Sequence, residues 1–470
     1  MEVPGVKRVA LRNRVRVVTA AALFDGHDAA INIMRRLMQR AGAEVVHLGH
    51  NRSAAEIVDA ALMEDAQAIA ITSYQGGHVE FFKYVIDLLR ERGAGHVRVF
   101  GGGGGVIVDD EIRELEEYGV AKIYSPEDGR RMGLKGMIDH LLQESDFETP
   151  RLPLRNGRID PADLRRVASI LTQVENGRTD ELPDEVRRAP VVGITGPGGA
   201  GKSVLTDELL RRFLHEYPGH RVAVLSVDPT HRRGGGALLG DRIRMNCIHP
   251  DRVYMRSFAT RGGASGLSGA VQGAIRVCRA AGYDVVLLES SGIGQADSGI
   301  VDVSDVTLYV MTPEYGAPSQ LEKIDMLDLA DVVAVNKSDR RGADDALRDV
   351  RKQVRRNREL FDAAEEDLPV FSTIASRFND TGVNALFEKL LEVLDERTGS
   401  DLRAKRASNL DAPYHDIVIV PPDRERYLGE IARCARDYRE DVERRAAAAQ
   451  RLYRLQGAAD VLGPRTPPAL

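Results

Sequence analysis

Cysteine is scarce in this sequence: only Cys247, Cys278 and Cys434 occur in 470 residues, and they lie far apart. No two of them have metal-ligand spacing, and so few cysteines fit a reducing compartment better than a disulfide framework. Long apolar runs are missing too. None approaches the roughly 18 residues that a membrane-spanning helix needs, and the N-terminal residues hold no apolar stretch of signal-peptide type. We therefore expect a cytoplasmic protein that does not contact the membrane.

Charge of one sign does not dominate either. The net charge is −6 at pH 7, which gives no general attraction to nucleic acid. Hydrophobic residues make up 43% and charged residues 29% of the chain, as is typical of soluble globular proteins. A chain of 470 residues is too long for a single core, so two or three domains are expected.

Strand-like and helix-like patterns alternate in two blocks, residues 12–146 and 191–397. This alternation predicts two α/β domains with doubly wound parallel sheets. In the first block the expected strands are 15–19, 44–48, 68–72 and 97–100, and the expected helices 29–40, 54–64 and 80–92. In the second block the expected strands are 191–195, 222–227, 285–288, 306–310, 332–335 and 370–372.

The rest of the chain is charged and rich in proline. We interpret residues 147–190 as a linker with one helix, at 161–172. Residues 398–470 form a tail with one strand-like run at 417–420 and a long charged helix at 424–455. This tail is too short for another enzyme domain.

Residues 196–203 spell G-P-G-G-A-G-K-S, which matches the phosphate-loop pattern G-x-x-x-x-G-K-[ST] after an expected strand and before a helix. Glycines let backbone N–H groups turn toward phosphates, the lysine reaches the β- and γ-phosphates, and the serine hydroxyl binds Mg²⁺. A chance glycine loop is the alternative. The expected nucleotide-binding residues are Gly196, Gly198, Gly199, Ala200, Gly201, Lys202, Ser203 and, further along the chain, Arg244.

A second nucleotide motif follows the strand expected at 332–335. Asn336, Lys337 and Asp339 match the N-K-x-D guanine-recognition pattern of GTPases. The aspartate can accept hydrogen bonds from N1–H and the amino group of guanine, which adenine does not offer. A polar turn is the bland alternative, but beside the phosphate loop the motif favours GTP over ATP.

Three acidic residues are candidates for a magnesium site with Ser203. Asp228 and Glu289 follow strands of the same expected sheet, and Asp241 lies in the loop between them. The segment 289–292, E-S-S-G, resembles the D-x-x-G switch with Glu in place of Asp. Because Mg²⁺ takes few protein ligands, we expect Ser203 to bind it directly and the acids directly or through water. Each acid alone could be a solvated strand end. The expected catalytic residues are Lys202, Asp241 and Glu289.

Residues 231–236, H-R-R-G-G-G, are interpreted as a mobile loop that senses the γ-phosphate. Arg232 or Arg233 could act as an internal arginine finger, although two solvated charges are the simpler interpretation. Where Ras-type enzymes carry a water-orienting glutamine, this chain has Ile293, and Gln295 comes two residues later. Slow, partner-dependent hydrolysis is therefore expected.

Together, D-P-T at 228–230, E-x-x-G-x-G-Q at 289–295 and N-K-S-D at 336–339 resemble the G-protein chaperones of methylmalonyl-CoA mutase. The resemblance covers essentially the whole second block. It implies a GTPase that gates cobalamin loading into a mutase and protects that mutase during turnover.

A metal-binding histidine is expected in the first block. Asp25, Gly26 and His27 follow the first strand, where the histidine can present one ring nitrogen to a metal while the aspartate accepts the other N–H. Alone, the pair could be a helix cap and a surface histidine. Glycines at the ends of the next strands leave room for a bulky group. They are Gly76 and Gly77, after Ser73, and the run 101–105 with Gly102 and Gly103.

These residues resemble the D-x-H-x-x-G, S-x-L and G-G motifs of cobalamin-dependent mutases, which have a flavodoxin-like cobalamin domain. Two positions depart from the pattern: Ala30 replaces the last glycine of the first motif, and Gln75 replaces the leucine of the second. The resemblance implies that His27 is the lower axial ligand to cobalt. The displaced nucleotide tail would then enter a pocket lined by Ser73 and the glycines.

The order of the two blocks resembles that of fused isobutyryl-CoA mutase. This resemblance implies adenosylcobalamin, GTP and Mg²⁺ as cofactors, and an isobutyryl-CoA/n-butyryl-CoA isomerase whose acyl-CoA-binding barrel, absent from these residues, is a further domain or a separate subunit. Oligomerisation through that barrel is expected. Two alternatives stay open: a cobalamin-sensing regulatory GTPase without a mutase, and a chaperone for another metal, for which the chain has no Cys/His cluster.

Overall fold

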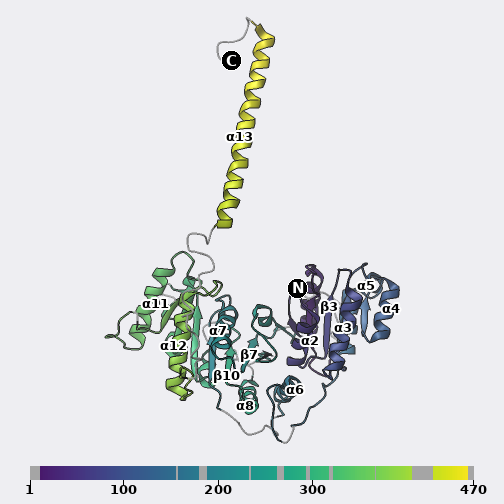
Figure 1. The fold of residues 1–470 in the computed structure, drawn as a ribbon, viewed down its shortest axis with the longest axis vertical. Helices are drawn as coiled ribbons and strands as arrows, with labels where there is room; N and C mark the ends of the chain where they lie inside the picture. Colours follow the sequence, from purple (N-terminus) through teal and green to yellow (C-terminus); the bar gives the residue numbers. More distant parts are fainter. Residues whose placement is uncertain are drawn as a thin grey trace. The chain divides into compact units, whose positions relative to one another are not determined.

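The computed structural model describes residues 11–154, 157–178, 188–231, 234–261, 269–292, 297–316, 321–365, 367–404 and 427–463. It divides into two compact units, Met1–Asp411 and Ala412–Leu470. The first unit contains two parallel sheets, and the second contains one long helix (Figure 1). The predicted fold class, two doubly wound α/β domains and a helical tail, is confirmed.

The first sheet has six parallel strands in the order β5-β4-β3-β1-β2-β8. Their bounds are β1 Arg16–Ala21, β2 Glu44–His47, β3 Ala68–Thr72, β4 Arg98–Gly102, β5 Lys122–Tyr124 and β8 Ala237–Leu239. The helices are α1 Ala29–Ala41, α2 Ala54–Met63, α3 His78–Glu91, α4 Asp109–Tyr118 and α5 Pro126–Glu144. Alternate strand residues face opposite ways, so Val17 packs with α1 and α5, and Val18 packs with α2 and α3.

The second sheet has seven parallel strands in the order β13-β12-β11-β6-β10-β7-β9. Their bounds are β6 Val191–Thr195, β7 Val222–Asp228, β9 Val253–Ala259, β10 Val285–Glu289, β11 Val306–Met311, β12 Val332–Asn336 and β13 Val370–Thr373. Helices α7 (Lys202–Glu216) and α12 (Thr381–Thr398) share one core with this sheet, and α8 (Val271–Ala281), α10 (Met326–Leu329) and α11 (Ala343–Asn357) share another.

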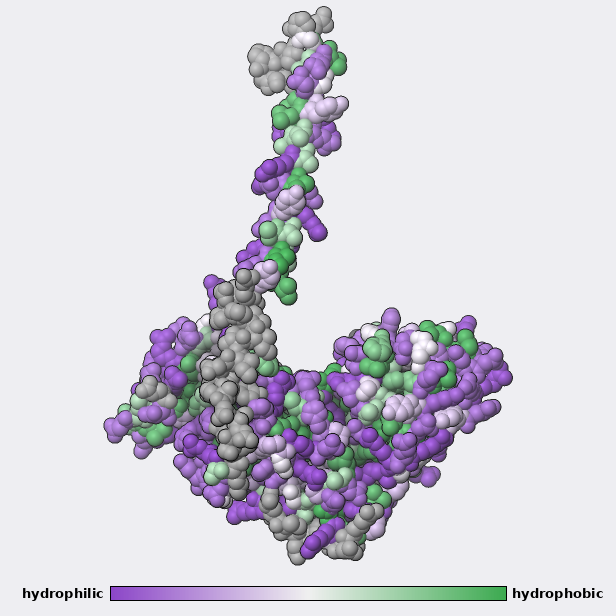
Figure 2. Space-filling model, in the orientation of Figure 1, coloured by the Kyte–Doolittle hydropathy of each residue, from purple (hydrophilic) through white to green (hydrophobic). Residues whose placement is uncertain are grey.

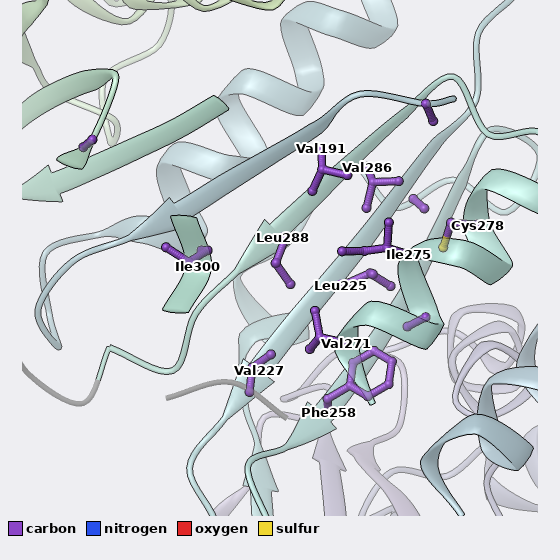
Figure 3. Close-up of a cluster of buried hydrophobic side chains, with 14 of the residues drawn as sticks. Val191, Leu225, Val227, Phe258, Val271, Ile275, Cys278, Val286, Leu288 and Ile300 are labelled. Carbon is purple, nitrogen blue, oxygen red and sulfur yellow. The ribbon is translucent and has the colours of Figure 1, made fainter. Parts of the chain in front are cut away.

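Buried β-branched residues make the strands of the second sheet nearly continuous apolar runs, as a parallel sheet covered on both faces requires. Figure 3 shows how α8 closes over them: Ile275, Val271 and Cys278 of the helix face side chains of the neighbouring strands. The strand side chains drawn there include Val191, Leu225, Val227, Phe258, Val286 and Leu288.

The segment expected to be a linker contains a helix that belongs to the core. Helix α6 (Leu164–Glu175) contacts both α2 and α8 (Figure 1), and its Val167, Leu171 and Val174 are buried. A helix with a buried apolar face stabilises the parts it joins, so this stretch contributes to the core as well as connecting the two sheets. Residues 179–187 lie outside the described residues.

Strand β8 is a second difference from expectation. It comes from the second block, directly after the glycines at 234–236, yet it pairs in parallel with β2 of the first sheet. The register places Glu44 opposite Ala237 and Val46 opposite Leu239. Part of the loop predicted to be mobile thus ends in a strand that extends the first sheet.

A cluster of buried ion pairs joins β1, β2 and α6. The Arg16 guanidinium lies 2.7 Å from Glu44, 3.2 Å from Glu64 and 3.0 Å from Glu175. Arg261 also binds Glu44, at 2.9 Å. Burial raises the pKa of Glu44, but Arg16 and Arg261 outweigh it and hold that pKa at about 2. The buried charges are thus neutralised by one another.

Replacing Glu44 by Gln is expected to lower the free energy of unfolding by about 3–5 kcal/mol, because buried Arg16 and Arg261 lose a partner. Since the folded pKa of Glu44 lies below its ordinary value of 4.5, the stabilisation is present above pH 4.5 and is lost as the pH falls through about 2. Urea unfolding followed by circular dichroism measures both effects. Glu114→Gln is the control, because Glu114 pairs with Lys83 at the surface and should cost about 0–1 kcal/mol. Equal losses in the two variants would contradict the prediction.

The second unit is helix α13 (Tyr427–Leu462), 36 residues long and without a buried residue. Side chains such as Leu428, Tyr438 and Tyr453 are exposed on it, and Figure 2 shows hydrophobic residues scattered among hydrophilic ones along the helix. The predicted strand at 417–420 and the first residues of the predicted helix lie outside the described residues. Across the described part of the chain, the helices are too short or too polar to cross a bilayer.

Candidate nucleotide and cobalamin sites

The phosphate loop lies between β6 and α7 and needs its glycines for close contacts. A Cβ on Gly196 would lie 1.9 Å from the carbonyl oxygen of Val310, and one on Gly201 would lie 2.4 Å from the Asn336 amide. Both residues have positive φ, 146° and 94°. Helix α7 starts at Lys202, so the N–H groups of its first turn point toward the loop, as an anion site requires. The Lys202 Nζ donates to the Gly196 carbonyl at 3.0 Å.

The guanine motif is attached directly to this loop. Asn336 Nδ2 donates to the Ala200 carbonyl at 2.8 Å, and Lys337 Nζ donates to the Gly199 carbonyl at 2.6 Å. Asp339 is exposed two residues further on. Asn336 Oδ1 also accepts the N–H of Ala375 at 3.0 Å. The sequence analysis did not predict this contact of Ala375. The one feature of the sequence that points to it is the position of Ala375 after strand β13, at the same edge of the sheet.

The candidate magnesium ligands converge on Ser203. Its Oγ lies 2.8 Å from Glu289 Oε1 and 3.1 Å from Asp241 Oδ1. Asp228 is linked to this group through the residue before Asp241: its Oδ2 accepts the N–H of Gly240 at 2.9 Å. Arg244, which is predicted to contact nucleotide, donates to Asp241 Oδ1 at 2.8 Å. The four predicted ligands therefore share one end of the second sheet.

The electrostatics of this cluster suit a divalent cation. Burial and the neighbouring Asp241 raise the pKa of Glu289 to about 8 and that of Asp228 to about 8. Glu289 Oε2 is buried and has no hydrogen-bond partner among the described residues. Mg²⁺ keeps waters and phosphate oxygens among its ligands and so takes few protein side chains. The residues fit Mg²⁺ bound together with a nucleotide.

Arg232, Arg233, Ile293 and Gln295 lie outside the described residues. Whether an arginine finger or a glutamine assists hydrolysis therefore stays a prediction.

At the carboxyl edge of the first sheet, His27 is held by Asp25. The His27 Nδ1 lies 2.9 Å from Asp25 Oδ1, and the other carboxylate oxygen accepts the N–H of Tyr74 at 2.6 Å. A carboxylate only accepts hydrogen bonds, so in the neutral imidazole Nδ1 carries the proton and Nε2 has the lone pair that a metal needs. The His27 side chain is 77% exposed while that of Asp25 is 1% exposed. A buried carboxylate thus orients an accessible imidazole.

A largely apolar cavity of about 280 Å³ opens beside this edge. It is lined from α1, β3, β4, β5 and α5 by Ala30, Ile31, Met34, Met38, Ala70, Ile71, Thr72, Tyr74, Phe100, residues 101–104, Tyr124, Ser125, Pro126, Gly129, Leu134, Met137, Ile138 and Leu141. The methionines and Tyr124 were missed in the sequence, because membership of the lining depends on how α1 and α5 pack.

The predicted pocket residues divide into two groups. Gly102 and Gly103 line the cavity, and a Cβ on Gly103 would lie 2.0 Å from the Ser73 carbonyl oxygen. Ser73, Gly76 and Gly77 are not part of this lining, and their contact with a cofactor stays a prediction. The Ser73 backbone lies against Gly103, and the neighbouring residues Thr72 and Tyr74 line the cavity.

Two buried hydroxyl groups beside the cavity are available to hydrogen-bond a ligand that has both polar and apolar parts. The Oγ1 of Thr72 and the Oγ of Ser73 are buried without hydrogen-bond partners among the described residues. Together with the free His27 Nε2 and the glycine-lined cavity, they fit a cobalamin whose nucleotide tail is displaced from cobalt.

Two family models match the chain, each in one of its two blocks. That of the methylmalonyl-CoA mutase-associated GTPase MeaB matches residues 168–419, and that of the B12 binding domain matches residues 15–128. The chain belongs to the MeaB family of mutase-associated GTPases. It carries a cobalamin-binding domain ahead of the GTPase domain, and these matches confirm cobalamin, GTP and Mg²⁺ as its cofactors.

Two relatives match nearly the whole of this chain. The fused isobutyryl-CoA mutase of Cupriavidus metallidurans is 55% identical over 98% of this chain and 43% of its own length. That of Geobacillus kaustophilus is 52% identical over 95% of this chain and 42% of its own length. The chain therefore spans less than half the length of these curated relatives. The resemblance inferred from the motifs is confirmed.

Among solved structures, a LAO/AO transport system kinase is 18% identical. The match covers 65% of this chain and 89% of the kinase, with a TM-score of 0.33. So low a score supports no conclusion about this MeaB-family chain.

Proposed function

We propose that this chain hydrolyses GTP to control cobalamin loading and retention in an acyl-CoA mutase. The observation that carries the proposal is that one compact unit contains both the Ser203–Asp241–Glu289 cluster beside a phosphate loop and the Asp25–His27 pair beside an apolar cavity. The chain thus has one site for a nucleotide switch and one for the cofactor that the switch controls. The residue roles below and the boundaries 12–146, 147–190, 191–397 and 398–470 are part of this proposal.

In the nucleotide site, the N–H groups of the loop bind the phosphates, and Lys202 exchanges the Gly196 carbonyl for a phosphate oxygen. Ser203, Asp241 and Glu289 would hold Mg²⁺ directly or through water, with Asp228 behind them. Bound Mg²⁺ neutralises phosphate charge. Glu289 would act as a carboxylate ligand once a cation is bound, because the cation would offset the burial and the Asp241 charge that raise its pKa.

In the cobalamin site, Asp25 keeps Nδ1 of His27 protonated and aims Nε2 at the space over the sheet edge. The cavity between α1 and α5 receives the nucleotide tail, where Thr72 and Tyr74 offer polar atoms. Adenosylcobalamin supplies the radical chemistry when bound, and the residues of this chain position it.

The names of the relatives suggest the substrate class and the partner. We propose that the chain acts with an acyl-CoA-binding barrel, as a further domain or a separate subunit, to interconvert isobutyryl-CoA and n-butyryl-CoA, and that the assembly oligomerises through that barrel. The 280 Å³ cavity is apolar and accounts for the cofactor tail, so substrate has to bind elsewhere.

The test combines this chain with a separately expressed mutase barrel, adenosylcobalamin and isobutyryl-CoA. The mixture is expected to form n-butyryl-CoA, detected by chromatography, and the chain alone is expected to form none while still hydrolysing GTP. The His27→Ala variant should hydrolyse GTP but fail to support the isomerisation. Isomerisation by the chain alone, or absence of GTP hydrolysis, would refute the proposal.

A further inference from the structure

Residues 234–240, which precede the metal-site residue Asp241, contact the cobalamin-binding domain. They include β8, which extends the first sheet beside β2. The N–H of Ala237 donates to the Ala43 carbonyl at 3.1 Å. We call residues 234–242 the bridging segment, because its end at Asp241 belongs to the candidate magnesium site.

Two glycines allow this close approach. A Cβ on Gly236 would lie 2.3 Å from the carbonyl oxygen of Ala43 and 2.4 Å from that of Gln39. A Cβ on Gly234 would lie 3.0 Å from the carbonyl oxygens of Gln39 and Arg40. Neither glycine adopts the left-handed conformation, since the positive-φ residue between them is Gly235. Packing against the end of α1, rather than turn geometry, therefore requires glycine at 234 and 236.

Helix α1 joins this contact to the cobalamin site. The helix starts at Ala29, two residues after His27, and ends at Ala41, beside the bridging segment. Met34 and Met38 of the same helix line the cavity. A shift of the helix at one end therefore moves the His27 loop or the cavity wall at the other, because a 13-residue helix behaves as a rigid rod.

The other end of the bridging segment is anchored in the nucleotide site. Asp241 contacts Ser203, and Gly240 contacts Asp228. The next residue, Arg242, is buried and lies 3.5 Å from Glu64 of α2's C-terminal end and 3.2 Å from the Met255 carbonyl. Neighbouring residues of one short segment thus contact the metal site and the cobalamin-binding domain.

We propose that the bridging segment couples the two sites. Occupancy of the nucleotide site sets the positions of Asp241 and Gly240. A shift of these residues moves β8, and the contacts of Gly234 and Gly236 then move the end of α1. The inference rests on the proposed function and names the residues that would regulate it. By linkage, nucleotide then changes cobalamin affinity by the same factor as cobalamin changes nucleotide affinity.

The decisive variant is Gly236→Ala in the full chain, with Gly219→Ala as matched control. A Cβ on Gly219 meets nothing within 4 Å, and Gly219 lies in the turn after α7, away from both sites. Cobalamin affinity is measured by absorbance titration with no nucleotide, with GDP and with a non-hydrolysable GTP analogue. Nucleotide affinities are measured by calorimetry with and without cobalamin.

Wild type and Gly219→Ala are expected to show a coupling factor of roughly 5–150 between the GTP analogue and cobalamin, equal in both directions. Gly236→Ala should bind each ligand alone and lose the coupling, so that the factor falls to about 1. Hydrogen exchange gives a readout without cobalamin: the analogue should change the exchange of the α1 amides in wild type and not in Gly236→Ala. The milder variant Gly234→Ala, with contacts of 3.0 Å, should lose part of the coupling, and it replaces Gly236→Ala if that variant does not fold.

The outcomes separate this inference from the function on which it rests. If wild type binds both ligands and the coupling survives in the glycine variants, the bridging segment is not the connection, and the proposed function stands. A coupling factor of 1 in wild type also overturns the inference, together with nucleotide control of cobalamin. If wild type does not bind one of the ligands, the proposed function itself fails.

Discussion

Asp339→Asn is expected to weaken GTP binding by about 10²–10⁴-fold and to make xanthosine triphosphate the better ligand. Hydrogen bonds to a charged group contribute about 1.5–3 kcal/mol each, and the Asp339 carboxylate can accept two from guanine. An asparagine amide offers a donor that repels the guanine amino group but suits the carbonyl oxygen at the same position of xanthine. The site is otherwise kept, because Asn336 and Lys337 hold the phosphate loop.

Calorimetry with GTP, ATP and xanthosine triphosphate measures this change of preference. Asp344→Asn is the matched control, since Asp344 is an exposed aspartate at the start of α11, just beyond the motif. It removes the same charge without touching the base, so GTP affinity should stay within about twofold, or roughly 0.5 kcal/mol. Equal affinities of wild type for ATP and GTP would show that Asp339 does not recognise guanine.

His27→Ala is expected to remove the histidine-ligated, base-off absorption spectrum that cobalamin acquires on the wild-type chain. The affinity for cobalamin should fall by at least about 10–100-fold. That is the usual loss when only a residue that orients a metal ligand is removed, and here the ligand itself is removed. Asp25→Asn should weaken binding by about that 10–100-fold, because the amide no longer accepts from both the imidazole and Tyr74 with full charge.

Absorbance titration follows both the spectrum and the affinity. His249→Ala is the control, because His249 is an exposed histidine in the loop before β9 of the second sheet. Two adjacent alanines give an independent check of the cavity. Ala30→Leu fills part of the cavity and should weaken cobalamin binding. Ala29→Leu is its control and should leave binding unchanged, because Ala29 is exposed and does not line the cavity. An unchanged spectrum in His27→Ala would assign the cobalt ligand to another residue.

Buried ion pairs also lie between the two sites, but they are poor positions for a test of coupling. Arg16, Glu44 and Glu175 join β1, β2 and α6, and Arg242 joins the bridging segment to Glu64. Removing one partner of such a network destabilises the fold by several kcal/mol. For this reason the test of coupling uses glycines at the contact rather than these charges.

Local patterns in the sequence determined much of the fold and most of the chemistry. Strand β3 covers the same residues 68–72 that its apolar pattern predicts, and β6 the same residues 191–195. The phosphate loop and the Asp25–His27 pair could also be predicted, because their residues are contiguous and backbone geometry alone brings them together. Family matches confirm the binding classes inferred from these motifs.

Strand β9 shows where a local pattern misleads. Its sequence, V-Y-M-R-S-F-A, has Arg256 and Ser257 in the middle of the strand, which interrupt the apolar run, and the strand was not predicted. Arg256 is only 1% exposed and pairs with Glu175 of α6. The partner that makes a buried arginine tolerable lies 81 residues away, and no local pattern reveals it.

Only the tertiary structure decided how the two halves meet. Three residues, A-L-L, are too few to show a strand periodicity, and β8 exists because the edge of β2 offers unpaired backbone groups to it. The same holds for α6 as a core helix, and for the cavity, whose lining comes from five separate elements. Periodicity and motifs report what neighbouring residues do together, whereas pairing, burial and cavities depend on which distant segments come into contact.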